Sequence, residues 1–498
     1  MFKNFLYLYF FLCISLSYSQ TYEDVLRYSS YFHEGSARFN SMGGAFGALG
    51  GDLSAISINP ASSSVFIDSE LGLSLNYKNQ KISNNFNNSY TLSKNDNYSF
   101  GGVGAVLVYD NGKYKFSLAY NHHILGNYDS SFKLSGQNEN GIDKYFLDYA
   151  EGIPYEDLLI YDDENIQSVY SYLGNNYGYA DQQAFLGYQS FVINETDDEY
   201  NNYVSNAVYN NLDQNLDIFR TGNHSQNSLN LGFSFNNYLF TGINVNIHET
   251  LFEEIKIFEE SGYLNNSNVK RILFKEDLIA YGNGVSFQIG TILKIKQFRV
   301  GLSYSTPTIF KIEEENSQFI ETNINDQDNL STYTIDPNTV NIYDEYTLKI
   351  PSKSLFSLAY IFGNKGLISF DYEMTKFNNS KFDDNNGKDS YLSSLNHLIK
   401  NKMSGFSESI RFGGEYRIKN LNLRIGYFSY KGPDYSMDNK INGISAGIGL
   451  NYGYIDIDLG ITKSNNFIDN RLFSRGLTNS YSIDKNILSL YSSFTIKL

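Results

Sequence analysis

The sequence contains no Trp, one Cys and six Pro, and only 18% of its residues are charged. Because Cys13 lies near the N-terminus, we expect no disulfide scaffold, thiolate metal site or cysteine nucleophile in the rest of the chain. The net charge of −16 argues against a nucleic-acid partner, since few cations are present to neutralise phosphates. After residue 19 no apolar run approaches about 20 residues, so we expect no transmembrane helix.

Aromatic residues and glycine are abundant instead, with 43 Tyr, 37 Phe and 40 Gly among 498 residues. At roughly 150 residues per domain, a soluble chain of this length would form three domains. A large β-barrel is an exception, because one sheet can run through the whole chain. The excess of Tyr and Phe fits the aromatic girdles at the two interfaces of a membrane barrel.

Residues 1–19 have the pattern of a signal peptide. Lys3 precedes the apolar stretch Phe5–Leu16, and Ser17-Tyr18-Ser19 occupies the cleavage positions, which leaves Gln20 at the new N-terminus. The alternative is an N-terminal anchor helix, for which the apolar stretch is short. We therefore predict an exported protein.

The body of the chain alternates between apolar and polar residues. In 421–430, Leu423, Ile425 and Tyr427 share one face, while Arg424 and Gly426 share the other. A period of two indicates strands with one apolar and one polar face. These strands run for about ten residues, which suits a tilted membrane strand better than a strand of a soluble sandwich.

Fourteen such segments predict an all-β fold, a transmembrane antiparallel β-barrel of about 14 strands. They lie at 70–78, 98–109, 113–123, 227–236, 238–250, 282–295, 297–306, 353–362, 365–376, 407–418, 421–430, 441–452, 454–463 and 486–498. Short turns such as Asn236-Asn237 and Lys419-Asn420, which favour tight hairpins, alternate with long loops. The predicted long loops are 79–97, 124–226, 251–281, 307–352, 377–406, 431–440 and 464–485. Short turns on the inner side and long loops on the outer side are typical of outer-membrane barrels.

The largest predicted loop, 124–226, is rich in Asp, Asn, Tyr and Glu. Its many Tyr, Leu and Ile residues argue against full disorder. We expect an ordered cap over the pore, with short helices at Asp148–Tyr161 and Asn165–Leu173.

Residues 20–69 precede the first strand. Tyr22–Phe32 can form an amphipathic helix, and a Gly- and Ala-rich stretch follows. No GK[ST] or GxGxxG pattern follows a strand, which excludes a phosphate-binding loop. Asp52–Ser57 followed by Asn59-Pro60-Ala61 predicts a helix and then a turn.

This N-terminal segment resembles the hatch of the FadL/TodX family, the long-chain fatty acid and hydrocarbon transporters of the bacterial outer membrane. Three downstream segments are similar to strands of that family: Leu348–Tyr360, Leu367–Tyr372 and Arg411–Tyr427. The residues matching the hatch motif are Gly43, Gly44, Gly47, Asp52, Asn59, Pro60 and Ala61.

The resemblance implies a monomeric barrel of residues 70–498, a hatch of residues 20–69 and a multi-pass location in the outer membrane. It also implies that a hydrophobic ligand diffuses from an outer groove past a mobile hatch. Two features depart from the family. The 124–226 loop is long, and strand 113–123 contains no Gly or Pro to mark a kinked lateral exit.

The alternation directs many charged residues into the lumen, where a lone charge would be costly. We expect an ion-pair lattice among Arg299, Asp371, Glu373, Arg411, Glu415, Arg417, Arg424, Asp456 and Asp458. The alternative is that Arg411, Arg424 or Arg38 of the hatch meets an anionic headgroup. His248 lies on the polar face with Asn244 and Asn246 and is a further ligand candidate.

The remaining chemistry is sparse. His122-His123 is expected at the outer rim, its two rings on opposite faces of a strand. No HxxxH or HExxH spacing occurs, so we expect no metal site and no cofactor. His248 is the only plausible base in the lumen and nothing marks a partner Ser, so we expect no enzymatic activity.

Two functions remain open at this point. The first is a channel for fatty-acid-like hydrophobic molecules, with membrane lipid around it. The second is a docking component of a secretion or surface-attachment machinery, with a protein partner at the outer loops. An aqueous porin is less compatible with an N-terminal plug. A channel requires an apolar groove under 124–226, whereas a docking barrel requires a filled lumen and an apolar outer patch.

Overall fold

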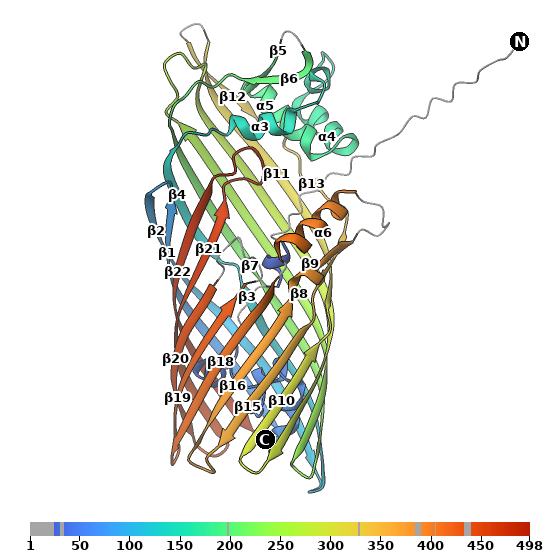
Figure 1. The fold of residues 1–498 in the computed structure, drawn as a ribbon, viewed down its shortest axis with the longest axis vertical. Helices are drawn as coiled ribbons and strands as arrows, with labels where there is room; N and C mark the ends of the chain where they lie inside the picture. Colours follow the sequence, from blue (N-terminus) through green and yellow to red (C-terminus); the bar gives the residue numbers. More distant parts are fainter. Residues whose placement is uncertain are drawn as a thin grey trace, which may run out of the picture.

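A computed structural model describes residues 24–29, 34–196, 199–326, 329–383, 390–403, 405–432 and 440–498. The predicted signal peptide lies outside these residues. All described strands except the separate hairpin β5–β6 form one antiparallel sheet, which closes on itself because β1 pairs with β22 along most of its length. Figure 1 shows the resulting tall barrel, with short turns at its lower end.

Fourteen strands make up the barrel wall, as predicted. Their bounds are β1 Glu70–Phe86, β2 Ser89–Asp110, β3 Tyr114–Asn127, β7 Leu212–Phe235, β8 Leu239–Ser261, β9 Val269–Ile295, β10 Phe298–Ser305, β15 Lys353–Ile361, β16 Gly366–Lys376, β18 Phe406–Ile418, β19 Leu421–Lys431, β20 Lys440–Asn451, β21 Ile455–Arg471 and β22 Ser480–Lys497.

Several wall strands continue past an irregularity towards the outer end. β4 follows β3 along β7, and β11 follows β10 along β9. Four short strands complete the outer sheet. Three of them, β12, β13 and β14, pair with β11, and β17 pairs with β14. The bounds of these segments are β4 Ser130–Asn138, β11 Thr308–Asp326, β12 Asn329–Ile335, β13 Asn341–Ile342, β14 Tyr346–Ile350 and β17 Lys381–Asp383.

The predicted strand lengths were too short, and parts of the predicted loops are strands. Residues 79–97 form a hairpin between β1 and β2 that turns at Asn87-Asn88, both at positive φ. The predicted loops 251–281 and 464–485 likewise contain long extensions of β8, β9, β21 and β22. Outside a membrane the outward face need not be apolar, so these extensions lack the alternation used to find strands.

The short turns at the other end agree with the prediction. Asn236 and Asn237 have φ values of 50° and 53°, and Lys419 has 53°. Positive φ at these positions matches tight hairpins between twisted strands.

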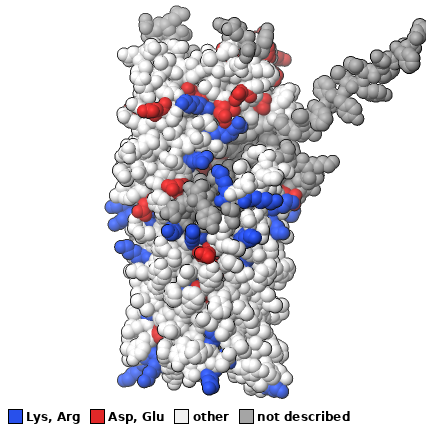
Figure 2. Space-filling view, in the orientation of Figure 1, with Lys and Arg blue, Asp and Glu red and all other residues white. Residues whose placement is uncertain are grey.

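The outward face of the lower barrel is apolar. Ile243, Val245 and Ile247 of β8 are exposed there, while Asn244 and His248 of the same strand are buried in the lumen. Figure 2 shows the lower barrel almost free of charged side chains, with charges gathered at its lower rim and across its middle. We refer to the part of the lower barrel between these two zones of charge as the apolar belt. Among the described residues, no helix is both long and apolar enough to cross a membrane.

A packed cap closes the outer end. It consists of α3 Asp143–Ala150, η3 Tyr155–Leu158, α4 Ile166–Asn176, α5 Tyr179–Gln189 and the hairpin β5 Ile193–Thr196 with β6 Glu199–Ser205. The helix predicted at 165–173 is present as α4. The helix predicted at 148–161 is wrong, because α3 ends at Ala150 and Pro154, with its extended backbone, separates it from η3.

The cap and the wall share one apolar core. Phe146 of α3 and Phe185 of α5 are fully buried with Phe274 of β9 and Leu216 of β7. A second cluster lies lower, where α1 Asp24–Arg27 meets α6 Ser390–Lys402 and the wall. The predicted helix 22–32 falls partly on residues that the structure does not describe, and its described part contains α1.

Candidate functional site

The chain from Gly35 to Phe66, referred to here as the plug, occupies the lumen of the lower barrel. It contains α2 Ala37–Ser41 and two 3₁₀ helices, η1 Leu53–Ser57 and η2 Pro60–Val65. Ser36, Asp52 and Asn59 cap these elements by accepting backbone N–H groups. The helix predicted at 52–57 is therefore a 3₁₀ helix, and Pro60 begins another one.

Glycines of the wall allow the plug backbone to approach closely. A Cβ on Gly426 of β19 would lie 2.2 Å from the Gly43 nitrogen, and one on Gly413 of β18 would lie 2.6 Å from the Met42 oxygen. On the other side of the lumen, a Cβ on Gly242 of β8 would lie 2.3 Å from the Pro60 oxygen. The plug is thus seated between two glycine surfaces of the wall.

Wall side chains also satisfy carbonyl groups of the plug backbone. Buried carbonyls require hydrogen-bond donors, and short irregular segments leave many unpaired. Asn244 donates to Ile56 at 2.8 Å, and Gln288 donates to Ile58 at 3.0 Å. Asn230 donates to Pro60 at 2.9 Å, and Lys115 donates to Phe66 at 2.9 Å. These bonds fix the plug along β3, β7, β8 and β9.

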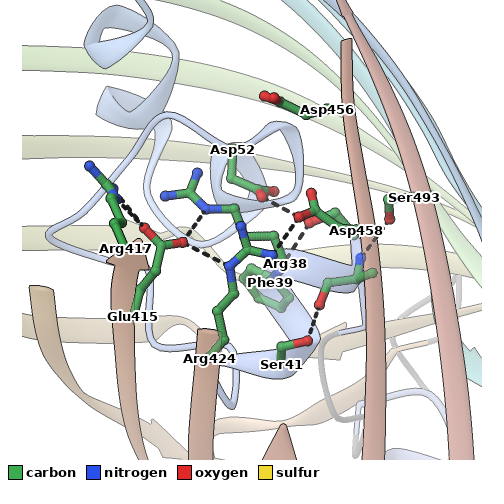
Figure 3. A network of polar contacts seen from close by, with 12 residues as sticks. Arg38, Phe39, Ser41, Asp52, Glu415, Arg417, Arg424, Asp456, Asp458 and Ser493 are labelled. Atoms are coloured by element: carbon green, nitrogen blue, oxygen red, sulfur yellow. Dashed lines mark hydrogen bonds and ion pairs between the residues drawn. The ribbon is translucent and has the colours of Figure 1, made fainter. Parts of the chain in front are cut away.

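On the opposite side an ion cluster joins the plug to the wall (Figure 3). The Glu415 carboxylate is 3.2 Å from Arg38 of the plug, 2.7 Å from Arg424 and 2.6 Å from Arg417. Arg424 also pairs with Asp458. Burial disfavours the charge on Arg38, but Glu415 and Asp52 outweigh this effect and raise the pKa of its guanidinium. Arg38 is therefore a permanent cation in this cluster.

Arg411 belongs to a neighbouring cluster. It lies 3.0 Å from Glu373 and 3.8 Å from Asp371, and its side chain is 1% exposed. The Asp371 carboxylate accepts the Gly47 N–H of the plug at 3.0 Å. Most of the predicted ion-pair lattice is present, and through Asp371 it also binds the plug. Two predicted members differ, because Arg299 donates to the Leu49 carbonyl of the plug and Asp456 pairs with Lys497.

His248 lies above the plug rather than with the arginines. Its Nδ1 is 3.2 Å from His224 Nε2, and its Nε2 is 3.0 Å from the Ser286 hydroxyl. The rim position predicted for His123 is wrong: the side chain is 1% exposed and faces the lumen. His122 faces outward against Phe100, which confirms the expected opposite orientation of the two rings.

Two cavities border the plug. A cavity of about 440 Å³ runs between the plug and β1, β2 and β22, and is lined by charged groups including Arg38, Asp52 and Glu415. A smaller cavity of about 40 Å³ lies over Ser57 and Ile58, beside His248. Charged walls along the larger cavity make it an unfavourable path for an apolar solute.

The barrel wall is interrupted between β2 and β3. Their hydrogen-bonded ladder ends at Gly102 and His123, although β2 continues to Ser89. Register shifts flank this point, at Ser74/Leu75 opposite β2 and at Ile124/Gly126 in β3. In the described part of the chain no backbone ladder joins β2 to β4. No Gly or Pro within 113–123 marks this break, because the irregularities lie just outside that range.

Polar side chains bridge the interrupted wall. Asn95 of β2 donates to the Ser131 carbonyl of β4 at 2.9 Å and accepts its N–H at 3.1 Å. Asn97 contacts the Asp129 carboxylate. Side-chain bridges of this kind separate more readily than a continuous backbone ladder, since each opens independently.

The structure brings three of the four predicted ligand residues, Arg38, Arg411 and Arg424, to the plug and leaves His248 above it. All three arginines are paired with carboxylates. Of the matched hatch residues, Gly43, Gly47 and Asn59 contact the wall directly. Sequence reasoning missed the amides Asn230 and Gln288, although their place in the inward-facing alternation of β7 and β9 could have indicated them.

No protein-family model matches the sequence, and no curated protein matches it. Among solved structures, a Pseudomonas aeruginosa FadL homologue is similar with a TM-score of 0.53 and 11% identity, over 94% of this chain and 99% of that one. The Pseudomonas putida toluene transporter TodX has a TM-score of 0.49 at 12% identity, and the Ralstonia pickettii toluene transporter TbuX has 0.48 at 11%, each over 94% of this chain and 99% of the other. The chain therefore has the fold of a FadL homologue, which confirms the resemblance to the FadL/TodX family at the level of the fold.

Proposed function

We propose that this chain is an outer-membrane channel that passes hydrophobic small molecules by diffusion, and that residues 1–19 direct its export. The fold, the apolar belt and the plugged lumen support this function. The interrupted ladder between β2 and β3 carries it, because unpaired backbone groups at the outer edge of a membrane are costly and the break offers a sideways path there.

The route that we propose leaves the lumen sideways. The plug is held by ion pairs, amide bonds and close backbone contacts, and the cavity beside it is charged. The break above Gly102 and His123 offers a way around the plug, and exposed Phe100 marks the outer part of the apolar belt beside it. Residues 20–69 then act as a fixed hatch that diverts the ligand. Passage of this kind needs no catalytic group.

The predicted ligand residues take two roles in this proposal. Arg38, Arg411 and Arg424 hold the hatch, because each is already paired with a carboxylate. His248 borders the small cavity over Ile58 and contacts a passing ligand.

A pair of engineered cysteines tests the route, since the mature chain has no thiol of its own. Asn97→Cys with Asp129→Cys places thiols where these two side chains now touch across the break. The control is Leu107→Cys with Leu118→Cys, a directly opposed pair on the sealed part of β2 and β3. The assay measures uptake of oleate and of toluene into proteoliposomes.

We expect oxidation to stop uptake through the Asn97/Asp129 variant and reductant to restore it, with no effect of either on the control. Unchanged uptake in the oxidised variant would overturn the sideways route. Absence of uptake in the wild type, for both probes, would overturn the channel itself.

One observation favours the docking alternative. The outer lumen is filled by the apolar core of the cap, and Tyr172 and Phe191 are exposed on the cap surface. A filled mouth is the feature that a docking barrel requires. Native mass spectrometry of the protein extracted from membranes separates the two functions: a retained apolar molecule supports the channel, and a retained protein at equal stoichiometry supports docking.

A further inference from the structure

Lysines gather at the outer edge of the apolar belt on one side of the barrel. Lys81 of β1 lies directly opposite Lys94 of β2, and Lys431 of β19 lies directly opposite Lys440 of β20. Lys463 lies on β21 between the two pairs. All five are exposed. Figure 2 shows cations across this height, above the pale lower barrel. We call these five residues the lysine face.

Two directly opposed lysine pairs are unusual in a chain with a net charge of −16. Like charges directly opposite each other on neighbouring strands destabilise a sheet. Among the described residues, Lys81, Lys94 and Lys463 form no ion pair, and neither does Lys440. On this surface the carboxylates of Asp96 and Asp484 are hydrogen-bonded to neighbours, and Glu408 of β18 lies directly opposite Lys431. An external anion between Lys81 and Lys94 would remove the repulsion between them.

An apolar groove of about 1000 Å³ runs below the lysine face along the belt. Gly414 faces outward at its floor, where an added Cβ would meet nothing nearer than 3.7 Å. Phe412, Ile425 and Leu488 form its sides, and Lys463 lines its outer edge. The cations and the groove are therefore continuous.

The opposite side of the barrel provides an internal comparison. A groove of about 1010 Å³ runs there along β3 and β7–β9, lined by residues such as Leu231, Ile243 and Ile289. The outward residues above it include Asn227, Glu249 and Asn283, and Lys311, which lies opposite Asn283, is paired with Glu345. The two grooves are alike in size and apolar character and differ in whether the lysines at their outer edge have a carboxylate partner.

We propose that the lysine face and its groove bind a lipid that carries several acyl chains and phosphate groups. The phosphates lie between the opposed lysines, where ammonium groups donate charge-assisted hydrogen bonds to them. The acyl chains lie in the groove below. The lipid is thereby held on the side of β19–β2 and is absent from the opposite groove. This assignment is independent of the channel activity.

The test uses the full-length barrel in detergent and four lysines changed together: Lys81→Gln, Lys94→Gln, Lys440→Gln and Lys463→Gln. The control changes four exposed lysines of the inner turns: Lys113→Gln, Lys296→Gln, Lys365→Gln and Lys419→Gln. The probes are diphosphorylated lipid A and an uncharged galactolipid. Native mass spectrometry measures the affinity of each, and heat-modified gel mobility verifies the folded barrel.

We expect the lysine-face variant to bind lipid A at least tenfold more weakly than the wild type, and the control variant to bind within twofold. Equal weakening in both variants, or equal binding of the galactolipid to the wild type, would overturn the proposal. So would the same thermal stabilisation by inorganic phosphate alone, or a dimer that disappears in the lysine-face variant. Lys81→Arg with Lys94→Arg keeps both cations and is expected to retain binding, which separates charge from folding.

Discussion

The plug in the lower barrel and the cap on the outer barrel close the same lumen with different chemistry. The plug meets the wall through glycine surfaces, wall amides and the ion cluster around Glu415. The cap meets the wall through buried aromatic and aliphatic side chains such as Phe146 and Phe274. Closure by polar contacts fixes position through many directional bonds, whereas closure by apolar contacts depends on buried area. The plug is therefore held in one register, and the cap can tolerate more change.

The strongest test of this difference is Glu415→Gln. Removing the carboxylate leaves Arg38 and Arg424 buried without their shared partner, and breaking a buried pair costs about 3–5 kcal/mol. Urea unfolding from micelles measures the loss, and protease cleavage within the plug reports its release. Asp217→Asn is the control, because its partner Lys133 has a side chain that is 67% exposed and such pairs contribute about 0–1 kcal/mol. Similar losses in both variants would contradict a structural role for the Glu415 cluster.

In the cap, Phe146→Ala should cost about 3 kcal/mol, since the ring is fully buried between α3, α5 and β9. Hydrogen exchange is expected to rise in α3 and α5 and to stay unchanged in the plug. Tyr161→Ala, at a side chain that is 55% exposed, should have little effect. If the plug also became accessible after Phe146→Ala, the two closures would not be independent.

Adjacent glycines of β18 separate the two faces of the wall. Gly413→Ala places a methyl 2.6 Å from the Met42 oxygen, which should cost about 1–3 kcal/mol through overpacking and shift the plug. Gly414→Ala faces outward with its nearest neighbour at 3.7 Å and is expected to be close to neutral. Differential scanning calorimetry of the pair measures the contrast. Equal melting temperatures would mean that the plug does not depend on close approach to β18.

The smallest expected effect is in a cap helix. The Asn165 side chain caps the start of α4 by accepting the Ser168 N–H, and the Ser168 hydroxyl accepts the Asn165 N–H in return. Asn165→Ala should cost about 1 kcal/mol. Asn175→Ala in the same helix, at an exposed position, is the control. Circular dichroism melting of the two variants should resolve the difference, and identical curves would show that packing alone holds α4.

The strands of the apolar belt could be predicted from the sequence, whereas the strands of the outer barrel could not. Within the belt, apolar residues face outward and polar residues face the lumen in strict alternation, as in Leu423, Arg424 and Ile425, so strands could be counted from the sequence. Above the belt that constraint is absent. β4 and β11 were therefore predicted as parts of loops, although β4 pairs with β7 and β11 pairs with β9.

The sequence predicted which charged residues line the lumen but not which of them pair with one another. The alternation placed Arg424 and Glu415 on inward faces, and the crowded lumen required pairing. The register between β18 and β19, which sets them opposite each other, depends on turn geometry and could not be obtained from composition. The role of Gly413 and Gly426 as seats for the plug was also hidden, because it depends on which wall segment the plug touches.

The pairing of β1 with β22 also constrains how the molecule is made. The Ala37 N–H of the plug donates to the Ser493 hydroxyl at 2.6 Å, a contact that spans 456 positions of the sequence. Contacts of such separation form late, because the chain entropy of closing the loop opposes them until the rest of the sheet is in place. β22 is thus required both to close the wall and to seat the plug. Plugging and closure of this barrel therefore depend on the same strand, and a variant truncated before Ser493 is expected to complete neither.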